Sequence, residues 1–247
     1  MIPKKHLIFG IHPILEALRA NEDIEKIFIK QEIKLSNKKE LFELASINNT
    51  PVQLVPAAKL KKITTENHQG VLAIKSQISF QNIEHLVPWW FENGIQPLVL
   101  ALDEITDVNN LGAIARTAEC AGFNAIIIPM KNSAQINAQT IKASSGALFQ
   151  VPICRINNLK ETIIFLKQSG FLSIAATEKA TKNYTEVDYL KPTVIILGSE
   201  EYGISKSVLN IADEHVSIPI FGSVKSLNVS VASAILIYEA IRQREKL

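Results

Sequence analysis

The sequence predicts an α/β fold in two domains, and three observations lead to this fold class. The chain has 247 residues, more than one domain of average size contains. Short apolar runs alternate with stretches that have the spacing of amphipathic helices, which is typical of strands followed by helices. This alternation breaks between residues 77 and 96, where Pro and Gly gather. We therefore predict a small domain over residues 1–76, a linker over 77–96 and a larger domain over 97–247.

The N-terminal region predicts a small α/β domain. Its apolar residues follow helical spacing in two stretches and form short strand-like runs in three others. In chain order, the predicted elements are a helix at 13–19, a strand at 26–29, a helix at 38–48, and strands at 52–55 and 71–75.

The stretch predicted as a linker contains both tryptophans of the chain, Trp89 and Trp90. Pro88, Gly94 and Pro97 interrupt regular structure around them. Because large aromatic side chains bury much apolar area, we expect the two tryptophans to pack between the domains rather than to stack on the bases of a nucleic acid.

The C-terminal region predicts a parallel sheet with helices on both faces. Its runs of Val, Ile, Leu and Ala lack the polar alternation of a half-exposed strand, as is typical of strands buried on both sides. Helical patterns, such as residues 110–121, lie between them. The five predicted strands cover residues 98–102, 125–129, 151–154, 171–177 and 194–198.

Composition excludes several classes of protein. No apolar run approaches the roughly 20 residues of a membrane span, and the hydrophobic content of 47% argues against a disordered chain. Two cysteines, Cys120 and Cys154, are too few for a disulfide-rich secreted scaffold, and no Cys/His cluster has zinc-ligand spacing. The first residues lack the apolar core of a signal peptide. We expect a cytoplasmic protein with no membrane partner and no metal ion.

The 26 basic and 24 acidic residues are unevenly distributed along the chain. Residues 1–75 contain 12 Lys+Arg against 8 Asp+Glu, whereas the remainder contains 14 against 16. A basic excess suits a polyanion such as RNA, although many solvated surfaces have the same composition. Charge therefore allows, without requiring, a nucleic-acid partner for the N-terminal domain.

The sequence argues against a nucleoside triphosphate site. No G-x-G-x-x-G occurs, and the nearest match to a phosphate loop, residues 198–205, has Ile204 where a phosphate-binding lysine would stand. Two acids, Glu200 and Glu201, lie within this loop. Carboxylates repel phosphate but suit a cationic or hydroxyl-bearing ligand, and a methylsulfonium cofactor has such a positive charge.

Three polar segments follow the ends of predicted strands, where α/β sheets bind ligands. Taken alone, each is also consistent with an ordinary helix cap or a polar turn. The helical pattern after the third segment is apolar around most of its circumference, so it needs a second surface, and a homodimer interface is a natural candidate. The segments are residues 103–117 with Asn110 as a candidate N-cap, the loop 198–203, and residues 218–232 with Ser226, Asn228 and Ser230 near the helix start.

These segments are similar to those of a known family. NNLGAIART, ILGSEEYGIS and IPIFGSVKSLNVSVASAILIYEAIRQR, in this order, resemble the three sequence motifs of the SpoU (TrmH-like) RNA ribose 2'-O-methyltransferases. IFGIHPILEAL at 8–18 and NHQGVLA at 67–73 resemble the N-terminal substrate-binding domain of one branch, a domain similar to ribosomal protein L30e. That branch methylates a guanosine ribose in large-subunit (23S) ribosomal RNA. The resemblance covers nearly the whole chain.

The resemblance implies a SPOUT-type α/β methyltransferase domain whose chain forms a trefoil knot, with a small L30e-like α/β domain before it. Sequence patterns alone predict an unknotted sheet, because true knots are nearly absent from proteins. The resemblance also implies a homodimer formed through the knotted domain and the last helix. S-adenosyl-L-methionine is held largely by main-chain groups in the family, and the matching positions here are Thr177, Gly198, Ile218 and Leu227.

The catalytic positions of the family match Asn110, Arg116, Glu200, Ser226 and Asn228. Methyl transfer to a ribose 2'-hydroxyl needs an in-line oxygen and a sink for its proton. Because deprotonating an arginine at pH 7 costs roughly 7.5 kcal/mol, we expect Arg116 to orient the hydroxyl and stabilise the developing alkoxide. Glu200 is expected to fix Arg116 or the target nucleotide, while Ser226 and Asn228 order their loop and hydrogen-bond the nucleotide.

Recognition of the target RNA is expected mainly from the N-terminal domain, whose lysines suit phosphates. His12, His68 and Gln69 lie in the family-like segments and are candidates for RNA contact, although a core or turn role for the two histidines is an open alternative. Two other functions also stay open: a transfer RNA ribose 2'-O-methyltransferase, and an RNA-binding protein without catalysis.

Overall fold

The computed structural model describes residues 6–31, 33 and 37–245. Residue contacts divide the chain into two compact units, Met1–Ser79 and Phe80–Leu247. The division falls within the stretch predicted as a linker. Much of that stretch is helical, since α4 covers Ile83–Glu92 and belongs to the second unit.

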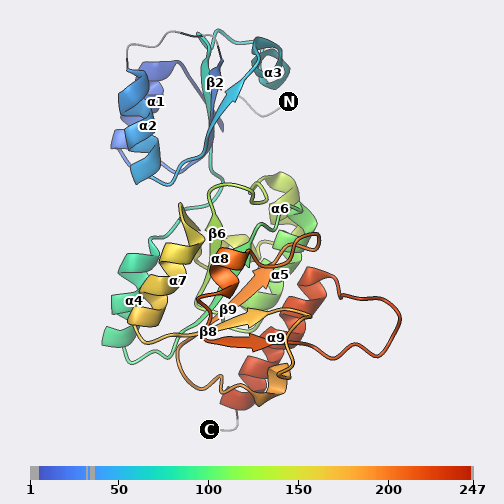
Figure 1. Ribbon diagram of the computed structural model, residues 1–247. Coiled ribbons are helices and arrows are strands. Elements are labelled where there is room, and N and C mark those ends of the chain that lie inside the picture. Colours follow the sequence, from blue (N-terminus) through green and yellow to red (C-terminus); the bar gives the residue numbers. More distant parts are fainter. Residues whose placement is uncertain (1–5, 32, 34–36, 246–247) are drawn as a thin grey trace. The chain divides into compact units, whose positions relative to one another are not determined.

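The first unit is a four-stranded mixed sheet with helices on both faces (Figure 1). The central strand β2 pairs in parallel with β3 and antiparallel with β4, and β1 completes the order β1-β4-β2-β3. Helices α1 and α2 pack on one face around Ile14 and Leu41, and α3 packs on the other face through Leu60. The elements are β1 Leu7–Phe9, α1 Ile11–Arg19, β2 Ile24–Lys30, α2 Lys38–Ile47, β3 Val52–Val55, α3 Ala57–Ile63 and β4 Val71–Lys75.

The second unit is a six-stranded sheet in which every strand pair is parallel, with the order β10-β8-β9-β5-β6-β7. This confirms the predicted parallel sheet, and the short strand β10, which ends at Val216, is added at one edge beyond the five predicted strands. The trefoil knot stays a prediction, because strand order alone does not define how the chain threads. The elements after α4 are β5 Leu98–Asp103, α5 Val108–Cys120, β6 Ala125–Pro129, α6 Ala138–Ala143, β7 Ile153–Ile156, α7 Leu159–Gln168, β8 Leu172–Ala176, β9 Thr193–Gly198, α8 Lys206–Leu209, β10 Glu214–Val216 and α9 Val229–Arg244.

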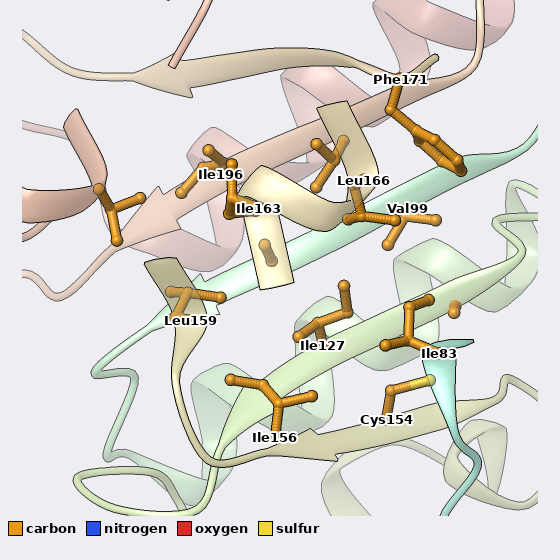
Figure 2. Close-up of a cluster of buried hydrophobic side chains, with 14 of the residues drawn as sticks. Ile83, Val99, Ile127, Cys154, Ile156, Leu159, Ile163, Leu166, Phe171 and Ile196 are labelled. Atoms are coloured by element: carbon orange, nitrogen blue, oxygen red, sulfur yellow. The ribbon is translucent and has the colours of Figure 1, made fainter. Parts of the chain in front are cut away.

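Both faces of this sheet are buried under helices, which explains the unalternated apolar strands. On one face, side chains of β5, β6, β7 and β9 pack against α4 and α7, as Figure 2 shows for Val99, Ile127 and Ile196 around Ile163. On the other face, α5 packs against both α6 and α9, and α9 contacts β9 (Figure 1). The two layers of helices leave the ends of the strands as the accessible parts of the sheet.

Trp90 packs inside the second unit, which corrects the expectation that it packs between domains. It is buried in the same apolar cluster, and its ring centroid lies 6.5 Å from that of Phe171. Helical spacing within α4 turns Trp90 toward the sheet with Ile83 and Val87, while Trp89 is exposed. Within the described residues, no helix combines the length and apolar character needed to cross a membrane, and no group of three metal-ligating side chains is present.

Gly112 allows α5 and α6 to approach closely. A Cβ at this position would lie 2.5 Å from the Ala143 Cβ and 2.9 Å from the backbone nitrogen of Ser144. We expect Gly112→Ala to lower the free energy of unfolding by about 1–2 kcal/mol, because overpacking outweighs the better helix propensity of alanine. Chemical denaturation measures this loss. The double variant Gly112→Ala/Ala143→Gly should recover part of it, whereas an unchanged stability of the single variant would contradict the close approach.

Candidate functional site

Polar residues of the three motif segments lie at the carboxyl ends of the parallel strands of the second unit. The loops after β5, β8 and β9 begin there, and the long loop that leads into α9 returns to the same edge. Ligands of open α/β sheets bind at this edge, because the loops that follow the strands surround a crevice there.

Three side chains from distant segments form one hydrogen-bonded cluster at this edge. The Nδ2 of Asn110 donates to Glu200 Oε1 at 3.0 Å, and the Nδ2 of Asn228 donates to the same oxygen at 2.5 Å. Asn228 Nδ2 also lies 3.1 Å from Asn110 Oδ1, which closes a triangle. The backbone nitrogen of Val229 approaches Glu200 Oε1 at 3.4 Å. Glu200 is therefore the common acceptor that joins the first, second and third sequence motifs.

Helix caps hold two members of this cluster. Asp107, and not Asn110 as expected, is the N-cap of α5, and its carboxylate accepts from the backbone nitrogens of Asn109 and Asn110. Asn110 is thus free to turn its side chain toward Glu200. Asn228 is the N-cap of α9, and its Oδ1 accepts from the backbone nitrogen of Ser230 at 2.9 Å, so its Nδ2 remains available to the cluster.

The loop with Glu200 is a closed turn fixed at both ends. Ser199 and Gly203 exchange backbone hydrogen bonds of 3.2 and 2.9 Å. Gly198 lies directly against this turn, and a Cβ there would overlap the backbone of Gly203 and Ile204. After the turn, the backbone nitrogen of Ser205 donates to Asp103 Oδ2 at 2.8 Å. Asp103 is buried at the end of β5, so it anchors the loop to the sheet.

A cavity of about 340 Å³ lies between the loops after β8 and β9 and the loop before α9. We call it the loop cavity. Its size falls in the roughly 300–1,000 Å³ range of small-molecule sites. Apolar side chains such as Leu197 and Val216 line it together with two glycines, Glu200 and Glu201. All four residues expected to hold a cofactor line this cavity, and so does Ser226: Thr177, Gly198, Ile218 and Leu227.

A second cavity of about 450 Å³ lies at the ends of β5 and β6, and we call it the strand-end cavity. It shares one wall with the loop cavity, formed by Ser199, Glu200, Glu201, Tyr202 and Val229. Its other lining residues are Glu104, Ile105, Thr106, Asp107, Asn110 and Asn132. Two cavities of small-molecule size therefore meet at Glu200, the common acceptor of the hydrogen-bonded cluster.

Arg116 lies apart from these residues. It is exposed on α5 and lines neither cavity. Six residues separate it from Asn110, which places it about 9 Å further along the helix and on a different face. Within a single chain, the structure thus brings together four of the five expected catalytic residues and leaves Arg116 on the surface.

The three residues expected to contact RNA lie in the first unit. His12 is exposed in the first turn of α1, and Gln69 is exposed in the turn before β4. The turn lies beside the segment before α1, since a Cβ added to Gly10 would lie 3.4 Å from Gln69 Oε1. His68 is partly buried and its Nδ1 accepts from the backbone nitrogen of Gly70 at 3.0 Å, which gives it a role in the turn.

Sequence reasoning missed several residues that shape the site. Asp103 anchors the loop and Asp107 caps α5, and the signal that could have identified them is their position at the end of β5 and directly before α5. Glu104 and Asn132 face each other in the strand-end cavity, where Asn132 Nδ2 donates to Glu104 Oε1 at 2.7 Å. Their pairing depends on β5 and β6 being adjacent, which the sequence pattern does not specify.

The fold and the two adjoining cavities define an α/β protein with room for two ligands side by side, as a group-transfer enzyme requires. Comparison with known proteins identifies its class. The model of the SpoU rRNA methylase family matches residues 97–238, and the model described as RNA 2'-O ribose methyltransferase substrate binding matches residues 7–81. The chain belongs to the SpoU family of RNA methyltransferases.

Individual relatives agree with this assignment. A protein of Staphylococcus saprophyticus assigned to the TrmH family of tRNA/rRNA methyltransferases is 35% identical over 96% of each chain. The solved AdoMet-bound rRNA methyltransferase of Sinorhizobium meliloti is 26% identical, with a TM-score of 0.59 over 96% of this chain and 87% of that one. A solved RNA 2'-O ribose methyltransferase is 27% identical, with a TM-score of 0.57 over 97% and 88%.

Proposed function

We propose that this chain transfers a methyl group from S-adenosylmethionine to a ribose 2'-hydroxyl of RNA, and that its target is a guanosine of 23S ribosomal RNA. The observation that carries this proposal is the meeting of the loop cavity and the strand-end cavity at Glu200. A methyl donor in one cavity and a nucleotide in the other would lie side by side, in contact with the same lining residues. Such side-by-side binding converts a bimolecular reaction into an effectively unimolecular one.

The loop cavity fits S-adenosylmethionine. The absence of a side chain at Gly198 keeps the closed turn 199–203 tight against β9, and the apolar lining suits an adenosine. Three carboxylates line the cavity against two lysines, and this acidic excess suits a cation: Glu178, Glu200 and Glu201 against Lys179 and Lys225. When bound, S-adenosylmethionine supplies an electrophilic methyl group on a positively charged sulfur. Thr177, Ile218 and Leu227 are the residues that would hold it, together with Gly198.

The cluster around Glu200 would hold the acceptor nucleotide. Its carboxylate fixes the side chains of Asn110 and Asn228 by hydrogen bonds, so all three groups are oriented before the nucleotide arrives. Ser226 lines the loop cavity close in sequence to Asn228, where its hydroxyl is placed to bond the nucleotide or the donor. Preorganised polar groups of this kind lower the barrier because they do not reorganise during the reaction.

We propose that a second copy of the chain completes the site. Phe221 is 97% exposed and Val224 is 71% exposed in the loop before α9, and Val231 and Tyr238 are about half exposed on α9 itself. Large apolar side chains this exposed, on one loop and the helix that follows it, fit an interaction surface. Figure 1 shows this loop extending from the N-terminal end of α9. Because α5 packs against α9, a copy covering α9 would also approach Arg116.

In this arrangement, Arg116 of the partner subunit would enter the strand-end cavity beside Glu200. Its guanidinium would orient the 2'-hydroxyl and a neighbouring phosphate and stabilise the developing alkoxide. The first unit would select the RNA, with His12 and Gln69 exposed on neighbouring segments. We place the enzyme in the cytoplasm, where its proposed substrates are. Both cysteines, Cys120 and Cys154, are free thiols, as suits a reducing compartment.

Two measurements on the purified chain test this function. Calorimetry should show S-adenosylmethionine binding, and tritium-labelled S-adenosylmethionine should transfer label to RNA extracted from cells that lack the protein. Binding of RNA without transfer of label would support an RNA-binding protein without catalysis. Transfer to tRNA but not to 23S rRNA would move the target to tRNA and leave the chemistry unchanged.

Gly198→Ala is expected to weaken cofactor binding strongly while the sheet stays folded. The added methyl group would overlap the backbone of Gly203 and Ile204, so the turn that forms one wall of the loop cavity must move. A displacement of about 1 Å in an enzyme site can lower the reaction rate on the order of 100-fold, and we expect a loss of cofactor affinity of about this size in calorimetry. Gly222→Ala is the matched control, because a Cβ there meets no atom within 4 Å. Equal affinity of the two variants would contradict this role of Gly198.

A further inference from the structure

We propose that Glu104 and Asn132 bind the Watson–Crick edge of the target base and select guanine, with Tyr202 stacking on its ring. The proposal rests on the proposed function and names the residues that read the nucleotide. All three side chains line the strand-end cavity, which adjoins the loop cavity through Ser199, Glu200, Glu201, Tyr202 and Val229. A ribose brought to Glu200 would therefore place its base in the volume that Glu104 and Asn132 border.

The backbone holds Glu104 and Asn132 in fixed orientations. They follow the ends of the neighbouring parallel strands β5 and β6, and the backbone nitrogen of Ala134 donates to the Ile105 carbonyl at 2.8 Å between the two loops. Both residues have left-handed backbone, with φ of 58° for Glu104 and 54° for Asn132. This conformation costs energy in residues other than glycine, and it persists where surrounding structure enforces it. The orientation of the pair is thus set by the loops.

The donors and acceptors of this pair are complementary to guanine. Guanine presents two adjacent donors, N1–H and N2–H, beside the acceptor O6. The carboxylate of Glu104 offers two acceptor oxygens, and the amide of Asn132 has a second N–H besides the one that donates to Glu104 Oε1. The carboxylate can accept both guanine donors while the amide donates to O6.

The other three bases do not match this arrangement. Adenine and cytosine place a ring nitrogen that is an acceptor next to their amino group, so a carboxylate would meet one donor and one acceptor. Uracil has a single N–H between two carbonyl oxygens. Each of these bases would leave a carboxylate oxygen of Glu104 facing another acceptor, and an unpaired polar group in a binding site is the main source of discrimination between similar ligands.

Tyr202 supplies the surface for stacking. Its side chain is 75% exposed at the wall shared by the two cavities. Glu104 and Glu201 line the strand-end cavity together with Tyr202. A hydrogen bond to Glu201, and to a smaller extent desolvation and the charge of Glu104, raise the pKa of the Tyr202 phenol. Exposed aromatic rings stack on unpaired bases in single-stranded RNA recognition.

The identity of the methylated nucleoside tests the proposal. RNA from cells lacking the protein is incubated with the purified chain and S-adenosylmethionine, digested, and analysed by mass spectrometry. We expect 2'-O-methylguanosine. A product of 2'-O-methyluridine, -cytidine or -adenosine would overturn the guanine assignment while leaving the proposed ribose methyl transfer intact. A lack of any methylated product would overturn the proposed function, and this inference with it.

Two variants and one modified substrate test the residues themselves. Glu104→Gln keeps the shape of the side chain but replaces one acceptor by a donor, so we expect kcat/KM for RNA to fall about 10- to 100-fold with unchanged affinity for S-adenosylmethionine. Asn132→Asp should show a comparable loss, because it replaces the donor to O6 by an acceptor. Glu161→Gln, an exposed position on α7, is the matched control and should behave as wild type.

A synthetic RNA fragment with inosine in place of the methylated guanosine separates recognition of the base from a structural role of Glu104, because inosine lacks the N2 amino group. The wild-type chain should methylate the fragment with guanosine with a kcat/KM about tenfold higher than the fragment with inosine. For Glu104→Gln, the difference in kcat/KM between the two fragments should be much smaller. Equal rates of the wild-type chain on both fragments would overturn the assignment. A Glu104→Gln variant that loses activity but keeps full discrimination would show that the residue only supports the loop.

Discussion

Glu200→Ala is expected to lower methyl transfer by about 100-fold or more, because the variant loses the common acceptor that orients Asn110 and Asn228. Without the carboxylate, Asn110 is held only through its bond with Asn228, which stays the N-cap of α9, and the wall shared by the two cavities loses its common acceptor. The fold should be preserved, since Glu200 is exposed and its bonds join loops and helix termini rather than the core. Single-turnover transfer of labelled methyl groups to RNA measures the loss.

Two further variants define the cause of this effect. Glu200→Gln keeps one acceptor oxygen and should fall between the wild type and the alanine variant. The exposed Glu161→Ala on α7 controls for the loss of a surface charge and should retain full activity. If Glu200→Ala transferred methyl groups at a rate close to wild type, the hydrogen-bonded cluster would have no part in the reaction.

Arg116→Ala is expected to be the second strongly impaired variant, with a loss of about 100- to 1,000-fold, the range found when one group that stabilises developing negative charge is removed. Arg116→Lys should remain strongly impaired, because lysine keeps the charge but lacks the planar fork that binds a hydroxyl and a phosphate together. Stability should change little, since the side chain is exposed. Near wild-type activity of the alanine variant would remove Arg116 from the mechanism.

A mixed dimer tests whether Arg116 acts across subunits. When chains with Arg116→Ala and chains with Glu200→Ala are co-expressed and combine at random, half of the dimers contain one of each. If Arg116 serves the partner's site, each mixed dimer has one intact site, so the sample should recover about a quarter of wild-type activity. If Arg116 serves the site of its own chain, every site is defective and the mixture stays inactive.

The sequence predicted the strands of the second unit well because each is determined by the pattern of its own neighbouring residues. Unalternated Val/Ile/Leu runs identify strands covered on both faces, and all five predicted strands are present. The missed elements had weak local signals. β1 has three residues, and α3 is a seven-residue helix with three lysines and one buried side chain, Leu60. Pro88 predicts an interruption of regular structure, but it lies within α4, which extends over Ile83–Glu92.

The candidate site was predictable in composition but not in geometry. The motif resemblance selected four residues that line the loop cavity. It also implies that main-chain groups hold the cofactor there, which would leave no side-chain pattern in the sequence. The contacts of Glu200 with Asn110 and Asn228 span 90 and 28 residues, and they exist because β9 lies beside β5 and α9 returns over the sheet. Strand order and loop path decide such contacts, and neither is encoded in a local pattern.

The position of Asn110 shows the same limit at smaller scale. Its residue type suits an N-cap, but Asp107 three residues earlier caps α5 instead, which frees the Asn110 amide for the cluster. The surface position of Arg116 was also not evident, because a helical pattern rich in Ala and Ile gives no sign of which face remains open. The basic excess of residues 1–75 over the rest of the chain, in contrast, is evident from the sequence alone, and it suits an RNA-binding first unit.

The most direct test of the account is a map of 2'-O-methylated nucleotides in the ribosomal and transfer RNA of a strain that lacks the protein, compared with the same strain carrying the wild-type or the Glu200→Ala chain. We predict that one 2'-O-methylguanosine of 23S rRNA is missing in the deletion strain, returns with the wild-type chain and does not return with the variant. Identical methylation maps in all three strains would contradict the central claim that this protein is an RNA ribose methyltransferase.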